Sequence, residues 1–301
     1  MFLSILTPTY NRESTLQRLW ASLEQQSFKD FEWLIVDDGS IDGTHAFVDD
    51  IRARSDLNIR YLYKQNGGKH TALNLGVEYA QGKLTFIVDS DDWLTSDAVA
   101  QIRKIYDRYK DHKEICGYSF LRKFPDGEIN GDLFKQDYYE ASYIEARVNS
   151  SDTHADKAEV YFTHVLREFP FPEFPDEKFL GEDVVWMRIA RNYRMIHINK
   201  AIYIGDYLSD GLTSNRRSNN IKSPQGCFCR AIEFTYPDVV AKQRIKAVVQ
   251  LIVYGKFAGK TVSEIIKASH SKIFTLLLLP AGFVIYRLWR HSNSTLLTSV
   301  G

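Results

Sequence analysis

Apolar and polar residues alternate in blocks along the first third of the chain, and these blocks predict strands and helices in turn. Short apolar runs predict four strands, at residues 2–7, 31–36, 59–63 and 84–88. Apolar residues at helical spacing predict helices that follow these strands, at residues 14–23, 44–54, 72–80 and 96–109. Ser14 is expected to cap the first helix. Repeated strand–helix units are typical of a largely parallel sheet covered by helices on both faces.

The pattern is less regular after this region. Residues 123–151 are polar and rich in tyrosine, with turn signals at residues 125–127, which favours a hairpin or a mobile lid. The role of residues 123–160 cannot be read from the pattern. Prolines exclude a regular helix at residues 169–175, a helical stretch follows from Gly181 to Arg191, and the chain beyond Pro237 is helical and basic.

Composition indicates a globular protein. The chain has 301 residues, 44% of them apolar, and a formal net charge of zero, which argues against disorder and against a nucleic-acid partner. Cys116, Cys227 and Cys229 do not form a disulfide framework, and we expect reduced thiols in a cytoplasmic protein. The start of the chain lacks the pattern of a secretory signal, so we expect no export by that route.

The C-terminal region carries an uncharged apolar segment at residues 273–286. It contains Pro280 and Gly282 and is too short for a straightforward membrane span. Many basic residues precede or follow it, with Glu264 as the main opposing charge. This combination predicts a surface that lies in a membrane interface. The alternative is a helix packed on the protein's own core.

Acidic residues follow two of the predicted strands. Asp89, Asp91 and Asp92 come directly after the fourth strand, and Asp37 and Asp38 follow the second. Carboxylates at the end of a buried strand are costly unless a cation or ligand neutralises them, and carboxylate oxygens suit Mg²⁺ or Mn²⁺ with phosphate completing the shell. In open α/β sheets such strand ends face the ligand crevice. The alternative for each cluster is a solvated turn.

The loop after the first strand has two further candidates. Tyr10 offers a face for stacking, and Arg12 offers a phosphate partner, although Arg12 could equally be a solvated charge near a helix start. After the second strand, one carboxylate of the acidic pair could accept a hydrogen bond from a nucleobase N–H or a ribose hydroxyl.

Five motifs occur together in one order. They are TPTYNR at residues 7–12, VDDGSIDGT at 36–44, NGGKHTALNLG at 66–76, DSDD at 89–92 and GEDVVW at 181–186. With them the chain, over roughly residues 1–215, resembles the family 2 inverting glycosyltransferases of the A-type fold. The resemblance implies a Rossmann-like, mostly parallel sheet flanked by helices, with a C-terminal helical extension. It also implies a nucleotide-sugar-binding half at 1–98 and an acceptor-binding and catalytic half at 99–215. The helical, basic and apolar pattern beyond them predicts a third, membrane-associated helical region at 216–301.

The resemblance assigns residues to the donor. Tyr10 and Asp38 match the base-recognition pair, with Pro8 and Arg12 beside them in the same donor-binding set. Lys69, in the Gly-rich loop, matches a position near the donor phosphates.

The resemblance also assigns the metal and the base. Asp89 matches the position near the ribose and the metal, and Asp91 matches the metal ligand that holds Mn²⁺ or Mg²⁺ against the diphosphate. Glu182 and Asp183 match the family's acidic pair, in which Glu182 belongs to the donor-binding set and Asp183 is the catalytic base. Relatives place a histidine or a polar loop where this chain has residues 207–215.

That segment contains no histidine, which puts the loop that closes over the diphosphate in doubt. Asp210, Ser214, Arg216 and Arg217 are the alternative partners for the diphosphate. His197 is the nearest histidine, and its apolar surroundings indicate a structural residue.

The expected activity is metal-dependent transfer of a hexosyl or related sugar from a nucleotide sugar, a UDP-sugar by family habit. The expected acceptor is a saccharide or a lipid-linked acceptor in bacterial-type surface polysaccharide assembly, at the cytoplasmic face of the cell membrane. One alternative is an inactive transferase-like protein that binds or scaffolds. The other is a nucleotidyltransferase, which would usually need a Gly-rich basic loop after the first strand, and TPTYNR lacks one.

Overall fold

The structure of the protein is a computed structural model that describes residues 1–150, 155–205 and 216–292. Its contacts divide the chain into two compact units. One comprises Met1–Pro170 with Ile189–Tyr207, and the other comprises Phe171–Arg188 with Leu208–Gly301.

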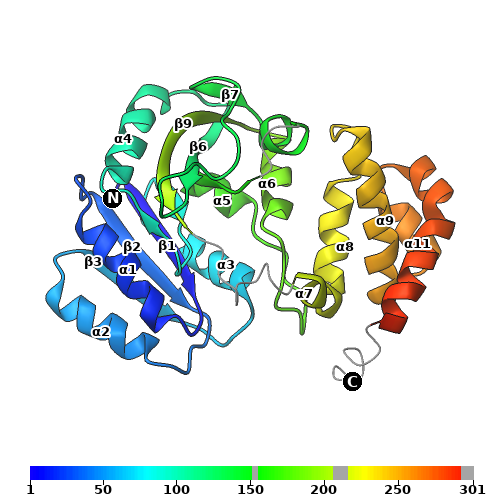
Figure 1. Cartoon of the computed structure of the whole chain (residues 1–301), viewed down its shortest axis with the longest axis horizontal. Coiled ribbons are helices and arrows are strands. Elements are labelled where there is room, and N and C mark those ends of the chain that lie inside the picture. Colours follow the sequence, from blue (N-terminus) through cyan, green and yellow to red (C-terminus); the bar gives the residue numbers. More distant parts are fainter. Residues whose placement is uncertain (151–154, 206–215, 293–301) are drawn as a thin grey trace. The chain divides into compact units, whose positions relative to one another are not determined.

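The first unit is built on a mixed sheet (Figure 1). Its strands are β1 (Leu3–Thr9), β2 (Phe31–Asp37), β3 (Asn58–Tyr63), β4 (Leu84–Ile87), β5 (Trp93–Leu94), β6 (Ile115–Lys123), β7 (Tyr139–Ala141), β8 (Lys157–Phe162) and β9 (Arg194–Ile204). They form a nine-stranded sheet in the order β3-β2-β1-β4-β8-β6-β9-β5, and β7 pairs with β9. The four predicted strands are β1 to β4, and all of their mutual pairings are parallel.

The order of the first four strands creates a topological switch point. Winding proceeds from β1 outward to β2 and β3, and then returns to place β4 on the other side of β1. In open α/β sheets ligands bind at such a switch point, beyond the carboxyl ends of the strands. Beyond β4 the sheet becomes mixed, because β8 runs antiparallel to both β4 and β6.

Helices cover both faces of this sheet. They are α1 (Glu13–Glu24), α2 (Thr44–Arg54), α3 (Lys69–Tyr79), α4 (Ala98–Tyr109), the single π-helical turn η1 (Ile144–Val148) and α5 (Thr163–Glu168). Apolar residues of α1, α2 and α4 share one buried cluster with Ile5, Trp33 and Phe86 of the sheet. On the other face α3 lies close to β1, since a Cβ at Gly76 would be 2.2 Å from a methyl carbon of Leu6.

The first and third helices begin differently from the prediction. The first helix begins at Glu13, and its N-cap is Arg12 without a side-chain cap, so the expected cap by Ser14 is wrong. The loop there is tied to the next βα unit, because the Arg12 N–H donates to Thr44 Oγ1 at 3.3 Å. The third helix begins at Lys69, three residues before the expected start, directly after Gly68 at φ 96°.

The segment at residues 123–150 is more than a simple hairpin. An isolated bridge joins Lys123 to Ile129, as in a hairpin turn. The chain then adds β7 to the edge of β9 and forms η1. Residues 151–154 lie outside the described part of the chain.

The second unit is helical, as predicted for the chain beyond Pro237. Its helices are α6 (Asp183–Ala190), whose last two residues belong to the first unit, α7 (Arg216–Lys222), α8 (Pro224–Glu233), α9 (Ala241–Phe257), α10 (Val262–Ala268) and α11 (Lys272–Ser292). A cluster of buried apolar residues from α8, α9 and α10 forms its core, and α11 packs against that cluster. Figure 1 shows α9 and α11 running alongside each other.

Helix α11 is longer than the apolar segment that the sequence singled out. It has 21 residues and continues through Pro280, so the expectation that it is too short to span a membrane is wrong. Among the described residues, α11 is the one helix that is long enough and apolar enough to cross a membrane. One face packs on α9, where a Cβ at Gly282 would be 2.6 Å from Ile252. The other face is apolar and exposed, and it presents Ile273, Leu276, Leu277, Val284 and Leu288.

Candidate functional site

Three carboxylates lie together where β4 ends. Asp89, Asp91 and Asp92 each offer an oxygen, and these oxygens lie within 4.8 Å of one another. A divalent cation with oxygen ligands at about 2.0–2.6 Å fits among atoms at this spacing. The donor set consists of oxygens only, which suits Mn²⁺ or Mg²⁺ rather than a soft metal.

Nearby cations affect the pKa values of these carboxylates unequally. Lys69 Nζ lies 2.5 Å from Asp89 Oδ1. Burial favours the neutral form of Asp89, but the Lys69 ammonium and Arg122 together outweigh burial and lower the pKa of Asp89 below its ordinary value. Burial and the charge of Asp89 raise the pKa of Asp91, and Arg12 and Lys69 offset this only in part. A further cation beside Asp91 would therefore be stabilising.

The third carboxylate, that of Asp92, is hydrogen-bonded to side chains of β6 and β9. Asp92 Oδ2 accepts hydrogen bonds from Arg122 Nη2 and from the Tyr203 hydroxyl, each at 2.7 Å. The same hydroxyl accepts the backbone N–H of Asp89 at 3.0 Å. Burial raises the pKa of Asp92 to about 7, although Arg122 opposes this. Gly205 allows this close packing, since a Cβ there would be 2.3 Å from Asp92 Oδ1.

The loops after β1 and β2 are hydrogen-bonded to each other. The Asn11 N–H donates to Ser40 Oγ at 2.8 Å, and the Ile41 N–H donates to Asn11 Oδ1 at 2.9 Å. Asn11 adopts φ 53°, a left-handed conformation that asparagine tolerates better than most residues. Tyr10, next to it, is 47% exposed, so its ring is open to a stacking partner.

Asp38 shapes the loop that precedes α3. Its carboxylate accepts hydrogen bonds from Lys64 Nζ at 2.7 Å, from the Gly67 N–H at 2.9 Å and from the Gly68 N–H at 2.7 Å. The residue is 4% exposed. The structure thus gives Asp38 an internal role in placing Lys69, and its contact with a nucleobase stays a prediction.

The first unit brings most of the predicted residues to one edge of the sheet. They lie at or beyond the carboxyl ends of β1, β2 and β4, or at the start of α3, and are Pro8, Tyr10, Arg12, Asp38, Lys69, Asp89 and Asp91.

Glu182 and Asp183 belong to the second unit. Asp183 is the first residue of α6, a position where the helix dipole favours a carboxylate. Arg230 Nε donates to Asp183 Oδ1 at 2.7 Å and to Oδ2 at 2.9 Å, and Arg230 Nη2 donates to Oδ2 at 2.5 Å. The cation expected beside the base is therefore present within the same unit. Glu182 is half-buried, and its carbonyl accepts the Val185 N–H at 3.0 Å.

Four residues that touch the candidate acids were not predicted from the sequence. Arg122 and Tyr203 hold Asp92, and Arg230 holds Asp183. Arg18 Nη2 donates to the Asp91 carbonyl at 2.5 Å, and its guanidinium stacks 3.8 Å above the Trp93 ring.

The predicted closing loop at residues 207–215, with Asp210 and Ser214, lies outside the described residues, and the same holds for the side chains of Arg216 and Arg217. His197 is fully buried, and its Nε2 lies 3.2 Å from the Ala141 carbonyl oxygen. It is a structural histidine, as expected.

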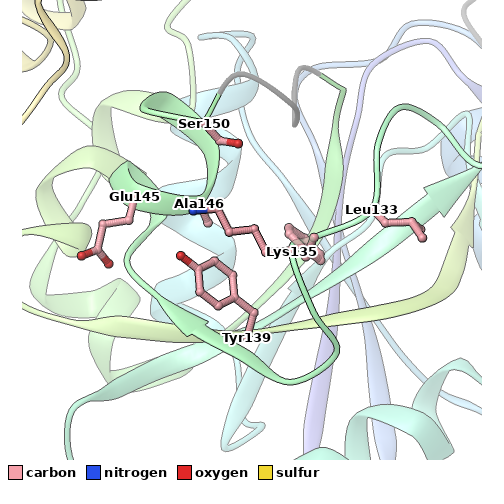
Figure 2. A pocket seen from close by; sticks show the side chains of 7 residues that line it. Leu133, Lys135, Tyr139, Glu145, Ala146 and Ser150 are labelled. Atoms are coloured by element: carbon pink, nitrogen blue, oxygen red, sulfur yellow. The ribbon is translucent and has the colours of Figure 1, made fainter.

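A small cavity lies elsewhere in the first unit, in the segment between β6 and β8 (Figure 2). Its volume is about 60 Å³, and Leu133, Lys135, Tyr139, Glu145 and Ser150 are among its lining residues. Small-molecule sites usually measure about 300–1,000 Å³. The cavity holds a few waters at most and includes none of the predicted site residues.

Comparison with known proteins agrees with this geometry. Residues 4–151 match the family model described as "Glycosyl transferase family 2". The poly(ribitol-phosphate) beta-N-acetylglucosaminyltransferase TarS of Staphylococcus aureus is 27% identical over 225 residues, which cover 71% of this chain and 38% of TarS. A GalNAc(5)-diNAcBac-PP-undecaprenol beta-1,3-glucosyltransferase of Campylobacter jejuni is 27% identical over 209 residues, or 67% of this chain and 63% of the relative. The chain thus spans less than two thirds of these relatives.

Solved structures show the same fold. The crystal structure of S. aureus TarS 1-349 superposes with a TM-score of 0.66 at 21% identity and covers 98% of this chain and 92% of that one. The mannosyltransferase PcManGT of Pyrobaculum calidifontis, in complex with GDP-Man and Mn²⁺, gives a TM-score of 0.55 at 18% identity and covers 98% and 84%. The mostly parallel sheet flanked by helices is therefore the A-type glycosyltransferase fold, and through residues 4–151 the chain belongs to glycosyl transferase family 2.

Proposed function

We propose that this protein is a metal-dependent, inverting glycosyltransferase. It moves a sugar from a nucleoside-diphosphate sugar to a saccharide or lipid-linked acceptor in the assembly of a cell-surface polysaccharide. The observation that carries the proposal is the carboxylate cluster at the end of β4, beside Lys69, in a family 2 domain. Relatives with related sequences act on poly(ribitol-phosphate) and on an undecaprenol-linked saccharide, which supports the acceptor class.

The first unit supplies the groups that a donor needs. Asp91, with Asp89, would hold Mn²⁺ or Mg²⁺, which when bound stabilises the negative charge on the departing diphosphate. Lys69 adds a positive charge next to the same carboxylates, and Tyr10 offers its exposed ring to the base. A UDP-sugar is the first donor to test, because TarS 1-349 has been crystallised with UDP-GlcNAc.

Asp183 would act as the base. In a direct displacement the acceptor oxygen bonds to the anomeric carbon while the bond from that carbon to the phosphate oxygen breaks. The nucleoside diphosphate leaves with the electron pair, and Asp183 takes the hydroxyl proton. Arg230 remains protonated beside it, so the carboxylate is paired with a cation before the proton arrives.

A donor panel tests the activity. UDP-GlcNAc, UDP-glucose, UDP-galactose and GDP-mannose are incubated with the protein and Mn²⁺ or with EDTA, and release of the nucleoside diphosphate is measured. We expect Mn²⁺-dependent release from one member of the panel. The anomeric configuration of the sugar released to water, read by NMR before it mutarotates, tests inversion. A protein that releases no diphosphate from any donor is a binding module and not a transferase.

Asp183→Asn tests the assignment of the base. General-base catalysis commonly contributes about 10²- to 10⁴-fold, so we expect turnover to fall by that amount while donor binding stays near that of the wild type. Calorimetry with the donor and Mn²⁺ measures binding, and the diphosphate assay measures turnover. Turnover that survives in this variant removes Asp183 from the mechanism.

We also propose that the protein is cytoplasmic and lies at the inner face of the membrane through α11. The exposed apolar face of this helix and the basic residues around it fit an interfacial position. A spanning position fits less well, because α11 packs along α9, which carries Lys242, Arg244, Lys246 and Lys256.

A further inference from the structure

Two ion pairs join helices α6 and α8 in the second unit. Asp183 pairs with Arg230, and Arg188 pairs with Glu233 through an Nε to Oε1 distance of 2.7 Å. In one pair the acid lies on α6 and in the other it lies on α8, so the two pairs are reversed copies of each other between the same helices. Both can hold the helices together, and only the first includes the proposed base.

The geometry of the first pair is unusually constrained. Arg230 Nε and Nη2 together contact both oxygens of Asp183, so the fork fixes the plane of the carboxylate as well as its distance. The guanidinium lies 4.7 Å from the centre of the Phe234 ring, which supports it from one side. Asp183 and Arg230 are 21% and 24% exposed, so both are largely shielded from water.

Gly181 makes room for this pair. A Cβ at this position would lie 2.8 Å from Asp183 Oδ1, 3.2 Å from Arg230 Cδ and 3.3 Å from Arg230 Nε. The first distance is too short for a real Cβ, so a side chain at residue 181 would displace the carboxylate from the fork. The glycine of the GEDVVW motif thus has a specific physical use.

We propose that Arg230 is a positioning residue for the transfer reaction, which holds the Asp183 carboxylate in the orientation that receives the acceptor proton. The assignment rests on the proposed function of Asp183. Each carboxylate oxygen has two lone-pair directions, so Asp183 can accept a proton from a hydroxyl while it still accepts the hydrogen bonds of Arg230. The proton moves from the acceptor oxygen to Asp183, and Arg230 neither gains nor loses one.

Lysine cannot replace arginine in this role. Its ammonium keeps the positive charge but lacks the planar fork, so it fixes neither the plane of the carboxylate nor both oxygens. Arg230→Lys therefore separates charge from orientation. Arg230→Ala removes both, and it leaves a space that a guanidinium ion can enter.

The test uses hydrolysis of UDP-GlcNAc with Mn²⁺, or of the panel member that the wild type hydrolyses fastest. Misplacement of a catalytic group by about 1 Å can cost about 10²-fold. We expect kcat to fall by about that factor in Arg230→Ala and by somewhat less in Arg230→Lys, with KM for the donor within about twofold of the wild type. Added guanidinium chloride at millimolar concentration should restore part of the turnover of Arg230→Ala and none of that of Asp183→Asn.

Arg188→Ala and Glu233→Gln are the matched controls, since they break the reversed pair between the same helices. We expect them to lower the melting temperature as the Arg230 variants do and to leave kcat near the wild-type value. If all four variants lower kcat in proportion to their loss of stability, Arg230 only docks the helices and the inference is wrong. In that case a strong effect of Asp183→Asn would still support the proposed function, whereas retained turnover in Asp183→Asn would overturn both.

Discussion

At the scale of single residues, the three acids after β4 differ in what surrounds them. Burial and the neighbouring charge of Asp89 raise the pKa of Asp91, as they do that of Asp92, so a cation would stabilise either carboxylate. Asp92 is already bonded to Arg122 and Tyr203. Asp92 therefore fixes the turn after β4 to the interior of the first unit, and Asp91 is the main candidate metal ligand.

Tyr203 tests this division of roles. Its hydroxyl joins the Asp89 N–H to the Asp92 carboxylate, so Tyr203→Phe frees the turn that carries Asp91 without removing any carboxylate. Residues that hydrogen-bond to metal ligands typically contribute about 10- to 100-fold to metal affinity. We expect Mn²⁺ affinity, measured from the EPR signal of the free ion, to fall by about tenfold.

Tyr118→Phe is the matched control. Tyr118 is also fully buried in the first unit, and its hydroxyl has no hydrogen-bond partner among the residues that the structure describes. We expect Mn²⁺ affinity to be unchanged in this variant, and Asp91→Ala sets the scale for loss of a ligand. Equal Mn²⁺ affinity in Tyr203→Phe and the wild type would contradict the anchoring role.

The sequence predicted the acids but not the residues that hold them. Asp89 and Asp91 follow an apolar strand, where local pattern singles them out, and Asp183 was assigned through the resemblance of its motif. Arg122 and Tyr203 lie 30 and 111 positions from Asp92, and Arg230 lies 47 positions from Asp183. Only the folded chain brings such residues together, and nothing in their local sequence distinguishes them from other polar residues of a strand or helix.

At the scale of the elements, local pattern placed β1 to β4 and their helices to within a few residues. It did not predict β8, which reverses direction between β4 and β6, or β7, which adds to the edge of β9. Parallel order follows from repeated strand–helix units, whereas an antiparallel insertion is decided by pairing with distant strands.

The junction of β7 and β9 should be sensitive to acid. Burial, with smaller contributions from Arg147 and Arg194, lowers the pKa of His197 to about 3, although the Ala141 carbonyl and Glu145 oppose this. The unfolded chain binds a proton at its ordinary pKa of 6.5, whereas the folded protein binds it only near 3. The contribution of His197 to the free energy of unfolding is therefore complete above pH 6.5. Below pH 6.5 this contribution decreases by about 1.4 kcal/mol for each pH unit.

His197→Gln tests this expectation, because glutamine can donate to the Ala141 carbonyl and does not titrate. Urea unfolding at pH 7 and pH 5 measures the free energy of unfolding. We expect the wild type to lose about 2 kcal/mol more than His197→Gln between these values. His112→Gln, at an exposed histidine, should behave like the wild type. The same pH dependence in all three proteins would mean that His197 is not the group responsible.

At the scale of the whole molecule, a net charge of zero conceals an uneven distribution. Between residues 241 and 292 nine residues are Lys or Arg, and Glu264 is the one acidic residue. The overall composition gave no indication of an anionic partner, because acids elsewhere in the chain balance this region. The helical unit alone combines basic residues with an exposed apolar helix face, and both features favour an anionic lipid surface.

Substitution on the exposed face of α11 tests membrane binding better than deletion of the helix does, because deletion would also uncover the face of α9 that α11 covers. Leu276 and Leu277 are 54% and 71% exposed, so Leu276→Glu with Leu277→Glu should leave the fold intact. Burial of a leucine contributes about 1.5–3 kcal/mol, and tenfold in binding corresponds to about 1.4 kcal/mol. We expect sedimentation with vesicles of phosphatidylglycerol and phosphatidylcholine to fall by at least about tenfold.

Leu133→Glu provides the control for this loss, since Leu133 is 56% exposed on the first unit and is remote in sequence from α11. We expect it to sediment as the wild type does. Binding of the wild type should weaken at high salt and on vesicles of phosphatidylcholine alone, because part of the attraction is electrostatic. If the double variant sediments as well as the wild type, the apolar face of α11 does not hold the protein at the membrane, and the proposed location is wrong even where transfer activity is intact.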